Sequence, residues 1–441
     1  MRKALEGICS EKRSGCEKEM GAENREREIL EESARGIERR LKKLQTFTAT
    51  PGRGVTRLPF SKEARRAADY LRLEMESAGL EAYVDVVGNV RGLLRADEPE
   101  AETIMMGSHY DTVKQGGAYD GAAGVVCALR VAELILRSGI RRKYNLEIIA
   151  FNDEEGMMFG SGCLGSKSLT GQVSREDIAR LTDENGISIE EWMRRWGSEP
   201  EALDGNRIDL NKVRAFFEIH IEQGPVLDNA REEIGIVSCI VGLLRCVVTV
   251  EGRADHAGTT PMNMRQDAIG IAAKAISHLD EFADDAGDGA VATCGFIRAQ
   301  PNAMNVVASQ CEFTMDIRAK DAAVIDGITN RAVQILDEEC RRCGAVYHVD
   351  IKLRQPPVSM AKPLMDRLAE KCEVHGYRYR QMLSGAAHDA MIFADKTDTA
   401  MVFVPSSEGR SHCPEEFSRC EDLDKAVQIV YETIADMMSG A

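Results

Sequence analysis

The stretch Leu146-Glu147-Ile148-Ile149-Ala150-Phe151-Asn152-Asp153-Glu154-Glu155-Gly156 joins an apolar run directly to three carboxylates. The apolar run predicts a buried strand, and carboxylates at the end of such a strand are costly unless positive charge meets them. Around it, short apolar runs alternate with helical patterns, at 82–87, 103–108, 122–138 and 146–151. This alternation indicates an α/β fold, in which helices cover the faces of a sheet.

The pattern changes after Pro225. The elements expected there are a strand, a helix, two strands, a helix and a strand, at 239–251, 264–282, 291–299, 309–318, 322–343 and 346–352. The order β-α-β-β-α-β is typical of a ferredoxin-like domain. A helix, a strand and a helix then resume the first pattern, at 363–375, 399–405 and 423–438. We therefore expect one α/β domain in two parts, residues 25–228 and 351–441, with residues 229–350 inserted between them. The polar residues 1–24 are expected to form a disordered tail.

The bulk properties exclude several classes of partner. The chain of 441 residues has a formal net charge of −16, which argues against nucleic acid and anionic membranes. An anionic substrate would need its own cationic clamp. No apolar stretch approaches the roughly 20 residues that span a bilayer. The 13 cysteines are scattered, and no signal peptide is evident, so we expect reduced thiols and a cytoplasmic protein.

Residue types that bind metals follow the expected strands. His109 and Asp111 come directly after the run 103–108, at the edge where α/β sheets place their sites. In this H-x-D pair the carboxylate can orient the imidazole. Asp120 lies between glycines, and it suits either a helix N-cap or a carboxylate that bridges two cations.

Three further positions complete the pattern. Glu154 and Glu155 suit a solvated loop, or one metal ligand beside a free general base. His220 ends a strand-like run and suits a core histidine or a ligand, whereas His412 lies in a Gly/Ser/Pro loop, where a structural role is less expected. Together these residues supply enough imidazoles and carboxylates for two metal ions and one spare base. They predict a metallohydrolase.

The motifs also resemble a known family over nearly the whole chain. They are Gly107-Ser108-His109-Tyr110-Asp111-Thr112-Val113, Gly116-Gly117-x-x-Asp120-Gly121, Asp153-Glu154-Glu155-Gly156, His220-Ile221-Glu222-Gln223-Gly224-Pro225, Ser384-Gly385-Ala386-x-His388-Asp389-Ala390 and Ser411-His412-x-Pro414-x-Glu416. They are similar to those of the M20-type dinuclear metallopeptidase superfamily. Within it they resemble the carbamoylase branch, which contains N-carbamoyl-L-amino acid hydrolases, allantoate amidohydrolases, ureidoglycolate hydrolases and β-ureidopropionases. The His220 block separates this branch from the peptidases, which usually have a carboxylate ligand there.

The resemblance implies a role for each metal-site residue. One divalent ion would be held by His109, Asp120 and His220, and the other by Asp120, Glu155 and His412. Glu154 would be the general base, and Asp111 would orient His109. Zinc or manganese would suit these ligands, with cobalt or nickel as further options.

It also implies where the substrate binds. His256 would stabilise the oxyanion, reaching in from the partner subunit of a homodimer, while Asn305 and Arg318 would hold the substrate carboxylate. The other expected substrate-binding residues are Gln223, Gly385 and His388. The inserted domain would act as lid and dimerisation domain, and the substrate would be a small anionic ureido compound.

The expected reaction is hydrolysis of the ureido carbon–nitrogen bond of an N-carbamoyl-L-amino acid or a similar ureido acid, with release of ammonia and carbon dioxide. Allantoate amidohydrolysis (allantoate deiminase activity) and ureidoglycolate hydrolysis are the nearest alternatives. A dipeptidase or aminoacylase, and a catalytically dead binding protein, are less favoured. Two departures from the family pattern bear on the substrate. The family usually has Arg two or three residues after the Glu-Glu-Gly block, where this chain has Met157-Met158, and it usually has Gly at the position of Ala387.

Overall fold

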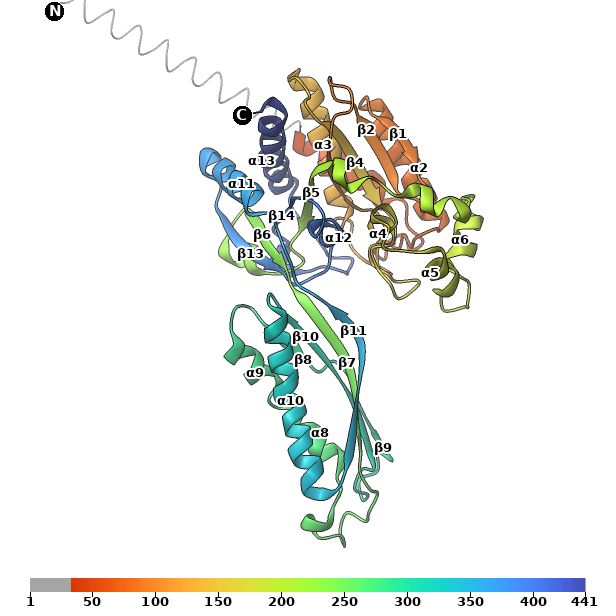
Figure 1. Ribbon diagram of the computed structural model, residues 1–441, viewed down its shortest axis with the longest axis vertical. Helices are drawn as coiled ribbons and strands as arrows, with labels where there is room; N and C mark the ends of the chain where they lie inside the picture. The colour runs from red at the N-terminus through yellow and green to blue at the C-terminus, as the bar shows by residue number, and fades with distance from the viewer. Residues whose placement is uncertain (1–32, 441) are drawn as a thin grey trace, which may run out of the picture. The chain divides into compact units, whose positions relative to one another are not determined.

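The computed structural model describes residues 33–440, so the expected tail at residues 1–24 lies outside the described part of the chain. The chain forms two compact units (Figure 1). Unit 1 contains residues up to 237, 360–382 and the residues from 388 onward. Unit 2 contains residues 238–359 and 383–387. None of the helices among residues 33–440 is long and apolar enough to cross a membrane.

Unit 1 is built on a mixed sheet, which confirms the expected α/β class. The strand order is β1-β2-β4-β3-β5-β14-β6-β12, and β13 pairs with β6. The strands are β1 (Glu81–Val84), β2 (Val90–Leu94), β3 (Thr103–His109), β4 (Asn145–Phe151), β5 (Val213–Ile221), β6 (Ile234–Ile240), β12 (Val358–Ser359), β13 (Tyr379–Ser384) and β14 (Thr399–Val404). The central strands β4, β3, β5 and β14 run parallel to one another, so their carboxyl ends meet at one edge.

The helices of unit 1 begin and end at recognisable signals. Ser61 caps α2 (Lys62–Ser77) through a hydrogen bond from the Ala64 amide, and Gly139 ends α3 (Ala122–Ser138) in the left-handed conformation. Helix α3 packs on β3 and β5 and against α13 (Cys420–Ser439), and α13 also contacts α11 (Figure 1). The other helices are α4 (Leu164–Thr170), α5 (Arg175–Arg180), α6 (Ile189–Trp196), α7 (Val226–Ala230), α11 (Lys362–His375) and α12 (Ala390–Ala394), and residues 33–45 are also helical.

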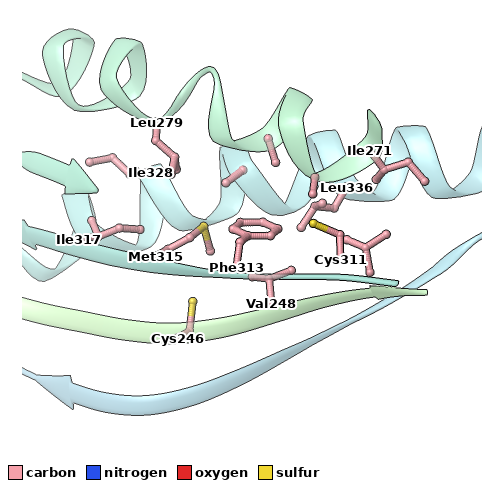
Figure 2. Packing of buried hydrophobic residues seen from close by; sticks show 14 of the residues in the cluster. Cys246, Val248, Ile271, Leu279, Cys311, Phe313, Met315, Ile317, Ile328 and Leu336 are labelled. Atoms are coloured by element: carbon pink, nitrogen blue, oxygen red, sulfur yellow. The ribbon is translucent and has the colours of Figure 1, made fainter. Parts of the chain in front are cut away.

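Unit 2 is an antiparallel sheet with helices on one face (Figures 1 and 2). The strand order is β11-β7-β10-β8, and β9 pairs with β10. The strands are β7 (Gly242–Glu251), β8 (Val291–Thr293), β9 (Ile297–Gln300), β10 (Gln310–Ala319) and β11 (Val346–Gln355). The helices are α8 (Ala268–Ile276), α9 (Leu279–Ala286) and α10 (Ala322–Cys343).

Alternation along β10 creates the core of unit 2. Cys311, Phe313, Met315 and Ile317 all point to the helices, because successive side chains of a strand point to opposite faces (Figure 2). They meet apolar side chains from all three helices, including Leu336 of α10. This continuous apolar layer gives unit 2 a core of its own.

Three expected elements are interrupted. The strand expected at 239–251 is two strands, β6 and β7, separated at Val241. The helix expected at 264–282 is instead α8 and α9: α8 ends at Ile276 with Ser277 as its C-cap, and the next residue, His278, is the N-cap of α9. The strand expected at 291–299 is divided into β8 and β9. Each break is marked only by a single glycine or a short polar pair (Gly242, Ser277-His278 and Gly295), which is too weak a signal to end an apolar pattern by itself.

Candidate metal centre

The carboxyl edge of the parallel strands brings the predicted ligands together. His109 is the last residue of β3 and pairs in register with Phe151, the last residue of β4. The segment Asp153-Glu154-Glu155 begins two residues after Phe151, and therefore lies beside His109. His220 on β5 pairs with Phe403 of β14, the strand that precedes the His412 loop. Sheet register thus places residues from distant parts of the chain at one edge.

Asp120 lies at the centre of this cluster. His109 Nε2 lies 3.6 Å and His220 Nε2 lies 3.2 Å from its Oδ1, while His412 Nε2 lies 3.1 Å from its Oδ2. Asp120 reaches this position because the next residue, Gly121, has a φ of 62°, and a Cβ there would lie 2.4 Å from the His109 ring. Only glycine allows the backbone to pass so close to the imidazole.

Two groups of three donors share Asp120. One contains His109, Asp120 and His220, and the other contains Asp120, Glu155 and His412, with the donor atoms of each within 4.8 Å of one another. These are the two sets that the family resemblance implies. Two overlapping groups meet the same distance criterion: His109 with Glu154 and Glu155, and Glu218 with His220 and His388.

The neighbouring carboxylates of Glu154 and Glu155 have different surroundings. Glu155 Oε1 lies 3.4 Å from His412 Nε2. Glu154 Oε2 lies 3.9 Å from His109 Nε2, beyond hydrogen-bond distance, and within residues 33–440 the only hydrogen-bond partner of its other oxygen is the Cys163 thiol, at 3.9 Å. Glu154 therefore lies beside His109 without a strong hydrogen-bond partner.

Asp111 contacts the glutamate segment more closely than the imidazole it was expected to orient. Its carboxylate accepts hydrogen bonds from the backbone amides of Glu154 at 3.1 Å and Glu155 at 3.3 Å. It lies 3.7 Å from His109 Nδ1, whereas its backbone oxygen lies 3.2 Å from that atom. Asp111 thus fixes the backbone from which both glutamates project.

The electrostatic potential of the site is strongly negative. Burial opposes protonation of His109, but the carboxylates of Asp120, Glu154 and Asp111 outweigh it and raise its pKa well above the ordinary value. Hydrogen bonds to Asp120 and Glu155 raise the pKa of His412 to about 10. Burial raises the pKa of Glu154 well above the usual range, and nearby carboxylates add to the rise while His109 opposes it. The cluster holds more negative charge than its imidazoles can neutralise.

The donor set fits divalent metal ions. The Nε2 atoms of His109 and His220 face each other at 3.4 Å, and both also face Asp120. Two protonated rings would repel each other at this distance, whereas a cation between them would accept an electron pair from each ring nitrogen and from the carboxylate. Mixed imidazole and carboxylate donors are ligands of zinc and manganese.

Two of the expected substrate-binding residues lie at the metal centre. Gln223 donates from Nε2 to both oxygens of Asp120 at 3.2 Å, and its Nε2 lies 3.4 Å from His412 Nε2. The buried ring of His388 packs edge-on against His220, with centroids 4.4 Å apart. Burial and the neighbouring His220 lower the pKa of His388 well below the ordinary value, which keeps it neutral.

The other expected substrate residues belong to unit 2. His256 is exposed, and its segment pairs with that of Asn305 through the Ala257 amide, which donates to the Asn305 carbonyl at 2.9 Å. Arg318 projects from β10, where Asp316 accepts hydrogen bonds from its Nε at 2.8 Å and its Nη2 at 3.2 Å. Its Nη1 donates to the Gly385 carbonyl at 2.7 Å. The guanidinium is therefore held in a fixed plane.

Sequence reasoning missed two buried glutamates of this region. Glu218 accepts hydrogen bonds from Ser108 Oγ and the Ala390 amide, both at 2.8 Å. Its spacing of two residues from His220 on a strand, which puts both side chains on one face, was the available signal. Glu416 belongs to a motif that drew attention only through His412.

Comparison with known proteins gives one consistent result. The profile of Peptidase family M20/M25/M40 matches residues 105–436. The N-carbamoyl-L-amino-acid amidohydrolase of Paenarthrobacter aurescens is 38% identical over 397 residues, covering 90% of this chain and 96% of that protein. The allantoate amidohydrolase of Escherichia coli is 36% identical over 393 residues, covering 89% and 95%. A crystal structure of a hydantoinase/carbamoylase family amidase from Burkholderia multivorans matches with a TM-score of 0.84 and 28% identity, covering 92% of this chain and 98% of that one. The resemblance predicted from the motifs is confirmed.

Proposed function

Because the chain belongs to peptidase family M20/M25/M40, within its hydantoinase/carbamoylase branch, we propose that it is a metal-dependent amidohydrolase that cleaves the ureido carbon–nitrogen bond of an N-carbamoyl-L-amino acid. The products would be the amino acid, ammonia and carbon dioxide. The observation that carries the proposal is a pair of donor sets sharing Asp120, with Glu154 beside them as a spare carboxylate. A binding protein would have no need for that spare base.

His109, Asp120 and His220 would hold one divalent ion, and Asp120, Glu155 and His412 the other. Zinc or manganese is our preferred assignment for both positions, with cobalt or nickel as alternatives. When bound, such ions would polarise the ureido carbonyl and lower the pKa of water at the site.

The protein's own groups would handle the protons and the charge. Glu154 would take a proton from the attacking water and return it to the leaving nitrogen, which its lack of a strong partner supports. Asp111 would keep the glutamates in register through their backbone amides. His256 of a partner subunit would donate to the oxyanion. Gln223 and His388 would contact the substrate beside the metal centre.

We further propose that Arg318 and Asn305 hold the substrate carboxylate. A guanidinium already fixed by Asp316 suits a carboxylate, because little side-chain freedom remains to be lost on binding. The strand order β11-β7-β10-β8 with helices on one face supports a ferredoxin-like lid inserted between the two parts of the catalytic domain. This lid would also form the dimer contact.

Allantoate is the second candidate substrate, and ureidoglycolate the third. The similarity to the E. coli allantoate amidohydrolase is nearly as high as the similarity to the P. aurescens enzyme. All these candidates share a ureido group beside a carboxylate, so the chemistry at the metal centre is the same. Three positions depart from the family pattern, Ala387, Met157 and Met158, and these are our candidates for residues that distinguish the substrates.

The test is ammonia release by the protein reconstituted with manganese or zinc. The panel would contain N-carbamoyl-L-amino acids and their D-enantiomers, β-ureidopropionate, allantoate and ureidoglycolate, beside N-acetyl amino acids and dipeptides scored for free amine. Turnover of the ureido compounds alone supports the proposal, and the highest kcat/KM identifies the substrate. Cleavage of dipeptides or acetyl compounds, or no turnover with metal bound, contradicts it.

A further inference from the structure

Glu416 joins two loops that carry proposed metal ligands. Its Oε1 accepts hydrogen bonds from the backbone amides of Tyr119 and Asp120, both at 2.9 Å. Its Oε2 accepts hydrogen bonds from Ser411 Oγ at 2.7 Å and from the His412 amide at 3.3 Å. One carboxylate therefore contacts the backbone of both Asp120 and His412, residues almost 300 positions apart.

The carboxylate is buried close to the backbone of the Asp120 loop. Glu416 is only 4% exposed, so its charge is compensated mainly by these four donors. The nearby Gly117 makes room for it, because a Cβ at that position would lie 2.0 Å from Glu416 Oε1 and 2.4 Å from its Cβ. The missing side chain of Gly117 therefore leaves the space that the Glu416 side chain fills.

We propose that Glu416 is a positioning residue, which sets the separation between Asp120 and His412 and so prepares the donor set of Asp120, Glu155 and His412 for its metal ion. The inference rests on the proposed metal centre. Glu416 itself would touch neither metal nor substrate, since both of its oxygens are engaged by backbone and serine donors. Residues that hold ligands from behind typically change metal affinity or activity by about 10–100-fold when replaced.

Two substitutions disturb this arrangement from opposite sides. In Glu416→Gln the amide oxygen can still accept from Tyr119 and Asp120, but the NH2 group faces the His412 N–H, so the hydrogen bond to that amide is lost and only the Ser411 hydroxyl, now as acceptor, still links the side chain to that loop. Gly117→Ala keeps the carboxylate but displaces it. The matched control is Asp85→Asn, because Asp85 is also buried and accepts two backbone amides, from Val87 at 3.1 Å and Asn89 at 2.9 Å, but holds no proposed ligand.

The experiment titrates Co²⁺ into chelator-treated full-length protein and follows visible absorbance, with thermal unfolding of each metal-free variant as the measure of stability. We expect two Co²⁺ equivalents for the native protein and for Asp85→Asn. In Glu416→Gln and Gly117→Ala we expect one of the two to bind about 10–100-fold more weakly. Turnover at saturating metal should then recover, which a general loss of folding would not allow.

Unchanged Co²⁺ affinity in both site variants overturns the positioning role and leaves the proposed function intact. The role is equally contradicted if Asp85→Asn weakens binding as much as Glu416→Gln does. Native protein that binds no Co²⁺ contradicts the metal centre itself and, with it, the proposed function. If Glu416→Gln does not fold, Gly117→Ala alone decides between these outcomes.

Discussion

Replacing Glu154 by Gln tests the assignment of the general base. The change is isosteric and removes only the ability to accept a proton. The structure predicts that folding tolerates it, because in the described part of the chain the Glu154 oxygens have no hydrogen-bond partner closer than 3.9 Å. Burial also raises the pKa of this carboxyl well above the usual range, so a neutral amide is no worse accommodated than a charged group. We therefore expect the metal-free protein to keep or slightly increase its free energy of unfolding.

The expected loss is one of rate. A positioned general base contributes about 10²–10⁴-fold, equivalent to about 3–5 kcal/mol of barrier. The measurement is kcat for ammonia release with the best ureido substrate, together with metal content by mass spectrometry. Glu155→Gln is the contrasting variant, because it removes an oxygen that faces His412 and Asp120. We expect Glu154→Gln to retain both ions and Glu155→Gln to retain one.

Two results would refute this reasoning. A Glu154→Gln enzyme within tenfold of native kcat would show that another group moves the proton. Loss of an ion in Glu154→Gln but not in Glu155→Gln would show that the two glutamates have exchanged roles, as the alternative donor group of His109, Glu154 and Glu155 allows.

Three further substitutions have defined outcomes. Burial raises the pKa of Asp424 from 3.8 to about 6, so its ionisation destabilises the folded protein as pH rises through that range. Asp424→Asn should therefore add up to about 3 kcal/mol to the free energy of unfolding at pH 7.5. At pH 4 it should add nothing, and urea unfolding at the two pH values measures the difference. Phe313 is fully buried in the core of unit 2, so Phe313→Ala should cost about 3–5 kcal/mol in the unfolding of that unit, and a cost below about 1 kcal/mol would contradict the packing. Arg318→Lys cannot form the planar contact with Asp316, so KM for the ureido acid should rise about tenfold or more while kcat changes little, and an unchanged KM would remove Arg318 from the substrate site.

Much of the fold could be predicted where local signals end an element sharply. Helices α3 and α10 have the bounds expected from the sequence, because Gly139 and Gly344 follow them in the left-handed conformation. The breaks at Val241 and Ser277 have only weak local signals, Gly242 after the first and the polar pair Ser277-His278 at the second, and the apolar residues on either side keep their spacing. They depend on which neighbouring strand or helix each segment packs against, and that is decided by contacts distant in sequence.

In the candidate site, too, some features could be predicted from the sequence and others could not. Ligands at strand ends, such as His109, could be predicted because strand polarity brings them to one edge of the sheet. The finer contacts could not. That Asp111 holds the glutamate amides, and that Glu416 joins two loops, depends on backbone N–H groups, which every residue has and which the sequence therefore does not distinguish.

The position of β14 within its sheet has a consequence for biosynthesis. β14 is inserted between β5 and β6, although it is made long after both. At ordinary translation speeds the ribosome completes it about 10–35 s after β5. During that interval β5 and β6 each expose an edge that a neighbouring nascent chain can occupy. The arrival of β14 covers both exposed edges, and His412, the last of the proposed metal ligands, follows eight residues after its end. The strand that protects the sheet from aggregation and this residue are therefore made at nearly the same late time.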